Sequence, residues 1–105
     1  MATLTVIQTT AVPPRVRGAL SRWMLEPAPG LYVGTLSGKV RDELWAVIAA
    51  SVADGSAVLV HASGNEQRFT LETAGLSRRI PVDLDGAAVI ALNPGETEAL
   101  KELRQ

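Results

Sequence analysis

The stretch that decides the fold is Leu4-Thr-Val-Ile-Gln-Thr-Thr-Ala-Val-Pro-Pro-Arg-Val-Arg-Gly-Ala-Leu-Ser-Arg-Trp-Met24. Its apolar and β-branched opening predicts a buried strand over residues 4–9. Pro13 and Pro14 end that strand, because proline cannot donate a ladder hydrogen bond. Proline suits the first turn of a helix, where its missing N–H would be unpaired anyway, so a helix is predicted from Pro14. The apolar face of this helix comprises Val16, Leu20 and Trp23.

A second helix, four further strands and a short C-terminal helix are predicted after this unit. Residues 31–36 form a strand, and Ser37 then caps a helix that runs to about Asp54, with Gly55 at its C′ position. The apolar stripe of this helix comprises Val40, Leu44, Trp45, Val47 and Ile48. Strands follow at 56–62, 67–73 and 89–92, and a short helix at 96–105. In strand 67–73, alternation puts Phe69, Leu71 and Thr73 on the inner face.

This order of elements predicts an α+β fold. We expect a ferredoxin-like sandwich, with an antiparallel sheet that carries two helices on one face. The other face must be covered or polar, and a chain this small can cover it by pairing with a copy, so a homodimer is expected. Residues 1–94 are assigned to the ferredoxin-like domain, including a C-terminal partner-binding strand region, and residues 95–105 to a C-terminal tail.

Composition narrows the class of protein. The 105 residues include no cysteine, which excludes disulfides and thiolate metal sites. No apolar run is long enough to span a membrane and no signal peptide is visible, so we expect a cytoplasmic protein without a membrane partner. Residues 1–41 carry five basic side chains against one acidic, a net +4, whereas residues 42–105 carry five against ten, a net −5. This asymmetry favours two surfaces, one of them for a polyanion, although charges scattered over a solvated surface remain an alternative.

Three basic clusters are candidates for binding nucleic acid. Arg15 and Arg17 stand at the start of the first helix, where free backbone N–H groups also attract phosphate. The other two clusters are Lys39 with Arg41, at the start of the second helix, and Arg78 with Arg79, in a loop. Each of these charges alone is typical of a solvated surface. Together they predict contacts with a nucleic-acid backbone, because guanidinium binds phosphate without reading sequence.

The remaining candidates do not predict catalysis. Asp83 and Asp85 are the only close acidic pair outside the predicted helices, and they suit a partner contact or a solvated loop better than a metal site. His61 lies in an apolar strand, which is typical of a packed or edge-strand residue. Trp23 and Trp45 lie on helix stripes, which favours core packing over base stacking. No catalytic residue and no metal ligand is therefore predicted.

Several blocks of the chain are similar to a known family. They are Val12-Pro-Pro-Arg-Val-Arg-Gly18, Leu31-Tyr-Val-Gly34, Arg78-Arg79 and Pro81-Val-Asp-Leu-Asp-Gly86, in order and correctly spaced over residues 3–94. They resemble the type I-E branch of the second family of CRISPR-associated proteins. The resemblance implies a ferredoxin-like homodimer that acts in antiviral defence. It implies that this dimer bridges two dimers of the CRISPR integrase subunit, in a complex that holds duplex prespacer DNA and inserts it into the array.

The resemblance also implies roles for individual residues. Contact with the duplex backbone falls to Arg15, Arg17, Arg78 and Arg79, with Lys39 and Arg41 as further candidates. Contact with the integrase subunit falls to the segment 81–92, with Asp83 and Asp85, and to Glu66.

Two other functions are alternatives to the DNA-binding scaffold. Members of the family are often described as magnesium-dependent endonucleases acting on RNA or DNA, and many carry an acid at the end of the first strand. Thr9 and Thr10 stand there in this chain, and a hydroxyl is a poor ligand for a hard cation. We therefore favour a non-catalytic role that requires no cofactor, with magnesium needed only if the endonuclease alternative holds. An RNA-binding module is the third possibility, and the missing aromatic RNA-binding strands count against it.

Overall fold

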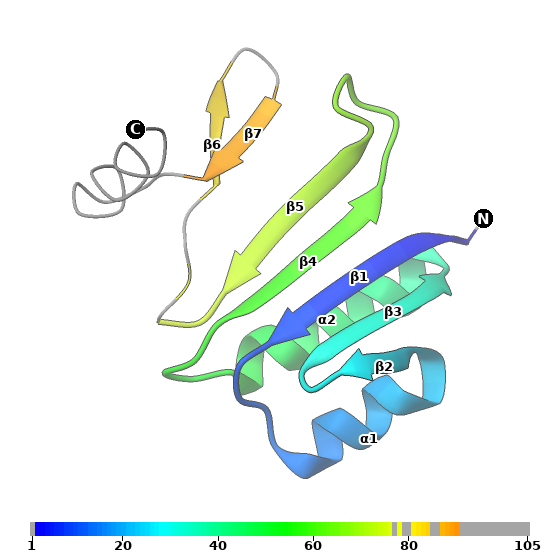
Figure 1. The fold of residues 1–105 in the computed structure, drawn as a ribbon, viewed down its shortest axis with the longest axis vertical. Helices are drawn as coiled ribbons and strands as arrows, with labels where there is room; N and C mark the ends of the chain where they lie inside the picture. The colour runs from blue at the N-terminus through cyan, green and yellow to red at the C-terminus, as the bar shows by residue number, and fades with distance from the viewer. Residues whose placement is uncertain (1, 77, 79–80, 85–86, 91–105) are drawn as a thin grey trace, which may run out of the picture.

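A computed structural model describes residues 2–76, 78, 81–84 and 87–90. The elements are β1 (Thr3–Thr9), α1 (Pro14–Trp23), β2 (Leu25–Ala28), β3 (Leu31–Leu36), α2 (Gly38–Ser51), β4 (Ala57–Ala62), β5 (Phe69–Ala74), β6 (Pro81–Leu84) and β7 (Ala87–Ile90). Strands β1 to β5 form one antiparallel sheet in the order β2-β3-β1-β4-β5 (Figure 1). Strands β6 and β7 pair separately as an antiparallel hairpin.

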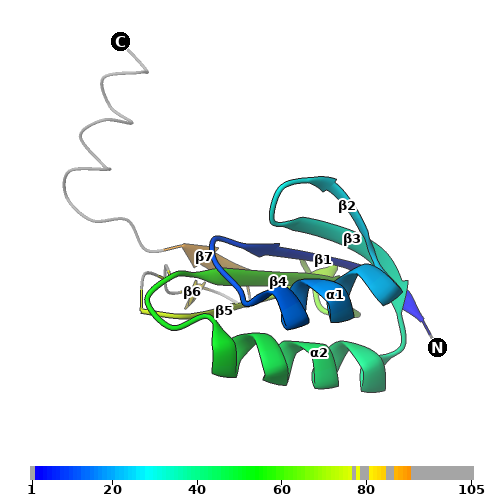
Figure 2. The same ribbon diagram turned by 90° about the horizontal axis from the view of Figure 1, so that it is seen from below.

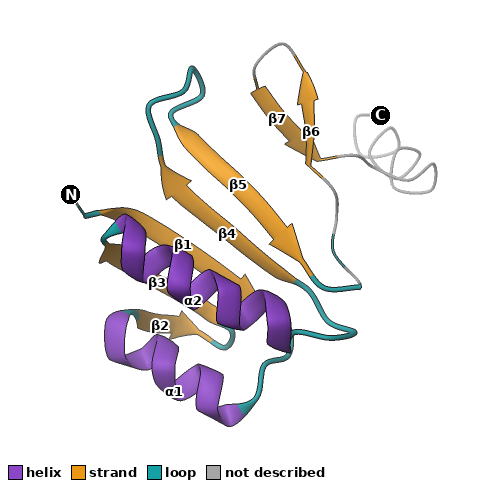
Figure 3. Ribbon diagram, turned by 180° about the vertical axis from the view of Figure 1, so that it is seen from behind, coloured by secondary structure: helices purple, strands orange, loops and turns teal. Residues whose placement is uncertain are grey.

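Both helices lie on one face of the five-stranded sheet (Figures 2 and 3). This is the predicted α+β, ferredoxin-like arrangement. The core lies between that face and the helices, because the apolar stripes of both elements must be buried against each other. Its fully buried side chains include Ile7, Leu20, Tyr32, Leu36, Ile48 and Leu59.

Helix α1 begins at Pro14, as the paired prolines predict. Val16 and Leu20 are buried, as predicted. Trp23 is 54% exposed, so its predicted place in the core is wrong. The helix ends at Trp23, and the backbone of Met24 is already extended. Met24, the next residue, is 5% exposed and belongs to the core.

Strand β2 was not predicted, because the sequence around it contains two prolines that resemble a helix stop. Pro27 is tolerated because β2 is an edge strand, where one N–H faces away from the sheet. The pairing with β3 is irregular: Leu25 pairs with Val33 and Ala28 with Leu31, with a register shift between them.

Helix α2 has the predicted N-cap, since the Ser37 hydroxyl accepts the N–H of Val40 at 3.3 Å. Its end differs from the prediction. The C-cap is Val52, and Ala53 rather than Gly55 has a left-handed backbone, with φ of 48°. The predicted stripe is also wrong at Val47, which is 42% exposed, because the face that meets the sheet comprises Leu44, Ile48 and Val52.

The sheet has an apolar face on the side away from the helices. Residues directly opposite in neighbouring strands point to the same side, so Val33, Val6, Val60 and Leu71 form one row across four strands. Phe69, Leu71 and Thr73 belong to this face, so their predicted place on the inner face is wrong, although the alternation itself is correct. Phe69 is 40% exposed and Leu4 58% exposed on it. Within the described ranges no helix covers this face.

The C-terminal strands differ in position from the prediction. The strand expected at 89–92 is β7, which begins two residues earlier, and its partner β6 was expected only as part of a motif. The helix predicted at 96–105 lies outside the described residues.

Candidate nucleic-acid interface

Two of the three basic clusters begin at the same end of the sheet. Strand β1 ends at Thr9, which pairs with Ala57, and Ala57 pairs with Ala74 at the end of β5. Helix α1 begins directly after β1, and Arg78 follows β5. We call this end, which carries Arg15, Arg17 and Arg78, the arginine end.

The start of α1 presents side chains rather than backbone donors to an anion. Pro14 has no N–H, and the N–H groups of Val16 and Arg17 both donate to the Pro13 carbonyl, at 2.9 and 3.2 Å. The expected contribution of free N–H groups is therefore small. Arg15 is exposed and has no hydrogen bond or ion pair with any other residue in the described part of the chain, so its guanidinium is available to a ligand.

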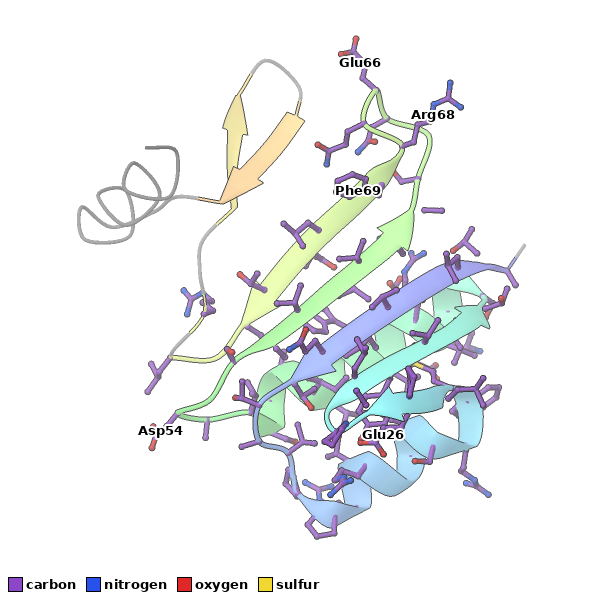
Figure 4. The ribbon with its side chains drawn as sticks, in the orientation of Figure 1. Glu26, Asp54, Glu66, Arg68 and Phe69 are labelled. Carbon is purple, nitrogen blue, oxygen red and sulfur yellow. The ribbon has the colours of Figure 1, made fainter. Side chains whose placement is uncertain are left out.

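Arg17 is held by a carboxylate that sequence reasoning missed. Its Nη2 lies 3.3 Å from Oε2 of Glu26, and the same oxygen accepts the N–H of Gly30 at 3.0 Å. Figure 4 shows Glu26 between β2 and α1. The neighbouring Tyr32 hydroxyl and the Glu26 carboxylate raise the pKa of Arg17. The Gly30 N–H and then Arg17 hold the pKa of Glu26 below its ordinary value, against the opposing effect of burial.

Gly30 fixes this carboxylate to the end of β1. Its φ of 80° favours glycine, and a Cβ there would meet the Thr9 carbonyl oxygen. The Gly30 carbonyl accepts the Thr9 N–H at 2.7 Å. The turn between β2 and β3 is thus tied to the strand that leads into α1.

A pocket of about 260 Å³ opens beside this cluster and is lined by residues that include Thr9, Thr10, Arg17 and Tyr32. Tyr32 is fully buried, and its hydroxyl has no hydrogen-bond partner among the described residues. The Thr10 side chain is fully engaged, since its hydroxyl accepts the Ser56 N–H at 2.8 Å and donates to the Ser56 carbonyl at 3.3 Å. Thr10 therefore ties the loop before α1 to the start of β4.

Arg78 is exposed, and its Nη1 donates to the Gly75 carbonyl at 3.0 Å. Gly75 has a φ of 95°, and a Cβ at this position would meet the Gly55 carbonyl oxygen. A tight backbone approach that requires glycine thus positions Arg78. Its sequence neighbour Arg79 lies outside the described residues.

Lys39 and Arg41 lie at the opposite end of the sheet from the arginine end. Helix α2 follows β3, whose last residue Leu36 pairs with Thr3 at the start of β1. Lys39 is exposed there. The Arg41 side chain is only 19% exposed, its Nε lies 3.3 Å from Oδ1 of Asp42, and its Nη1 lies 3.3 Å from Nδ1 of His61.

The predicted partner-contact residues are described in part. Glu66 is exposed at the tip of the β4–β5 hairpin, far from the arginine end, and Arg68 lies beside it (Figure 4). Glu66 and Arg68 both come from the acidic half of the sequence, so this hairpin tip carries charges of both signs. The backbone of Asp83 belongs to β6, its side chain lies outside the description, and so does Asp85.

Two residues of the site were not predicted, namely Glu26 and Tyr32. Glu26 is the only acidic residue among the first 41, and that isolation was a usable signal of a paired role. Tyr32 gave no such signal, because a tyrosine in an apolar strand is typical of a core residue.

No group of three or more histidine or acidic side chains is arranged to hold a metal ion in the described part of the chain. The two described helices lack the length and apolar character that crossing a membrane requires.

The fold and this surface define a small α+β protein with a ferredoxin-like sheet and exposed arginines at one end of it. Comparison with known families is more specific. The family described as CRISPR-associated protein (Cas_Cas2CT1978) matches residues 4–89, so the chain belongs to this Cas2-type family of CRISPR-associated proteins.

Proposed function

We propose that the protein is a non-catalytic scaffold of CRISPR adaptation. In this proposal a dimer binds duplex prespacer DNA and bridges dimers of the integrase subunit during spacer acquisition. The family supports a CRISPR-related role, and the type I-E resemblance supports the finer one. The observation that carries the proposal is the arginine end, where two helix residues and one loop residue offer guanidinium groups. Such groups bind phosphate without reading sequence, which suits a scaffold for foreign DNA of any sequence.

The span of the duplex follows from the length of the sheet. Lys39 and Arg41 are separated from the arginine end by the seven residues of β1, which extend about 20 Å. A duplex that touches both ends of one chain therefore needs at least about six base pairs along that direction. Lys39 stays in the proposal as such a distant contact. Arg41 is a weaker candidate, because His61 and Asp42 already engage its guanidinium.

A dimer is supported by the apolar face without helices. Val6, Val33, Val60 and Leu71 form a continuous row there, and each side chain is only partly buried in the single chain. Burying such a row against its copy would stabilise the pair through the hydrophobic effect. A two-fold axis would also present the arginine end twice, so that one duplex could meet six or more arginines.

The contact with the integrase subunit is proposed for the acidic residues Glu66, Asp83 and Asp85. Exposure of Glu66 at a hairpin tip supports this for one of the three. Acidic side chains at the edge of an interface favour a basic partner surface and mainly raise the rate of association.

The magnesium-dependent endonuclease is the alternative, and the residues at the end of β1 do not fit it. Magnesium prefers carboxylate and water oxygens. Here the Thr10 hydroxyl is committed to Ser56, the Thr9 hydroxyl donates to the Gly30 carbonyl at 3.4 Å, and the cation Arg17 lies beside them. No catalytic step is therefore proposed for this chain.

The proposal is tested by comparing arginines at the two ends of the same helix. Arg15→Ala is expected to weaken binding of two unrelated duplexes to the same extent, because its guanidinium contacts phosphate. The matched control is Arg22→Ala, which removes an exposed arginine from the last turn of α1 and should leave affinity nearly unchanged. Duplex affinity is measured for both variants by fluorescence anisotropy, with and without the integrase subunit. Equal losses for Arg15→Ala and Arg22→Ala would contradict a localised interface, and loss on one duplex only would indicate base readout.

A further inference from the structure

The charge of Arg17 is not freely available to DNA in the isolated protein. Its Nη2 lies 3.3 Å from Oε2 of Glu26, although 56% of the arginine side chain is exposed. Arg15 and Arg78, the other arginines at this end, have no carboxylate partner among the described residues. Arg17 thus differs from them in facing a built-in anion.

Glu26 is fixed in place independently of Arg17. The same Oε2 accepts the Gly30 N–H at 3.0 Å, and only 24% of the glutamate side chain is exposed. Gly30 is in turn held to Thr9 by a 2.7 Å hydrogen bond. The carboxylate therefore has an anchor that does not involve Arg17.

We propose that Glu26 is an internal competitor of duplex phosphate for the Arg17 guanidinium. This inference rests on the proposed function, because it assigns a regulator to the same duplex-binding end. A phosphate that recruits Arg17 must draw it away from a carboxylate of the same charge. Affinity for DNA is then lower than the exposed arginines alone would give, which limits retention of DNA by the free protein.

The geometry of the Arg17–Glu26 contact favours competition with phosphate over a role in which Glu26 orients Arg17 for DNA binding. If Glu26 held Arg17 in the binding orientation, its removal would weaken DNA binding. The guanidinium is the exposed partner and the carboxylate the anchored one, so we expect Arg17 to move between two anions rather than to hold both. The exposure of the pair keeps the effect modest because water and salt screen it.

The test is Glu26→Gln, measured as duplex affinity at low salt. The amide oxygen of glutamine can still accept the Gly30 N–H, so the turn is kept while the charge is lost. Affinity is expected to rise about two- to fivefold for each Arg17 that contacts the duplex, the range for an exposed ion pair. The matched control is Glu43→Gln, which removes an exposed carboxylate from α2 and reports the general effect of lower negative charge. Thermal melting of each variant confirms that the fold is retained.

A double-mutant cycle shows whether Glu26 acts through Arg17. In an Arg17→Ala background, Glu26→Gln should have no more effect than Glu43→Gln. An unchanged or weaker affinity of Glu26→Gln alone would overturn the inference, and so would a gain that persists without Arg17. Arg17→Ala alone distinguishes a failure of this inference from a failure of the proposed function. If it weakens binding but Glu26→Gln does not strengthen it, only this inference fails, whereas if Arg15→Ala and Arg17→Ala both leave affinity unchanged, the proposed function fails as well.

Discussion

At the scale of single residues, Glu26 connects its own strand β2 to the β2–β3 turn and to helix α1 through one carboxylate oxygen. It accepts hydrogen bonds from Gly30 in the β2–β3 turn and from Arg17 on α1. Both contacts favour the charged form and hold the pKa of Glu26 below its ordinary value of 4.5. The group therefore links folding to pH.

The direction of this pH dependence follows from the lowered pKa. A carboxyl group whose pKa is lower in the folded state adds stability above its unfolded pKa, and this is lost as pH falls through the folded pKa. Between about pH 6 and about pH 3, we expect the melting temperature of the wild type to fall further than that of Glu26→Gln. Thermal melts followed by circular dichroism measure this difference, and equal losses in the two proteins would contradict it.

At the scale of elements, the sequence predicted where helices start better than it predicted which side of a helix or strand is buried. The prolines before α1 and Ser37 before α2 act locally, through backbone chemistry that is visible in the letters. Which face a strand turns to the helices is a tertiary property, so alternation in β5 was correct while its assigned face was not. Strand β2 was missed for the same reason, because only its pairing with β3 explains an extended segment that contains Pro27.

In the candidate interface, too, local properties could be predicted from the sequence and tertiary ones could not. The arginines could be chosen from the sequence, since their charge and clustering are local. That Lys39 and Arg41 lie a sheet length away from Arg15 could not, because it depends on β1 and β3 being antiparallel neighbours. The Arg41–His61 contact likewise joins residues 20 positions apart through the packing of α2 on the sheet.

Two neighbouring residues of α2 test the assignment of its buried face. Ile48 is fully buried and Val47 is 42% exposed, although the sequence placed both on one stripe. Ile48→Ala should lower the free energy of unfolding by about 2–5 kcal/mol through lost burial and a cavity. Val47→Ala should change it by less than about 1 kcal/mol, because alanine is a better helix former than valine and little burial is lost. Urea denaturation monitored by tryptophan fluorescence measures both, and similar losses would contradict the observed face.

At the scale of the whole molecule, the apolar face away from the helices leads to a prediction of oligomeric state. A chain of 11.1 kDa that pairs through this face should give about twice that mass in light scattering at micromolar concentration. Val60→Asp puts a charge into the middle of the apolar row and should shift the mass toward the monomer, since an unpaired charge is costly to bury. A wild-type monomer throughout that range would contradict the dimer.

The dimer and the arginine end together make up the central claim, which is that a two-fold set of arginines holds a duplex by its phosphates. Each neutralised phosphate releases condensed counterions, so the logarithm of affinity falls with the logarithm of salt concentration by about 0.9 per contact. The effect of removing arginines on this slope therefore counts contacts directly. Arg15 and Arg78 suit the experiment best, because both are exposed and neither is paired with a carboxylate among the described residues.

The most direct measurement is a salt titration of duplex affinity for the wild type and for the double variant Arg15→Ala with Arg78→Ala. Two arginines on each of two subunits predict a slope that is shallower by up to about four, alike for duplexes of unrelated sequence. Melting curves of the two proteins should agree closely, because both side chains are exposed. A slope identical to that of the wild type would show that these arginines do not contact the duplex backbone and would contradict the account.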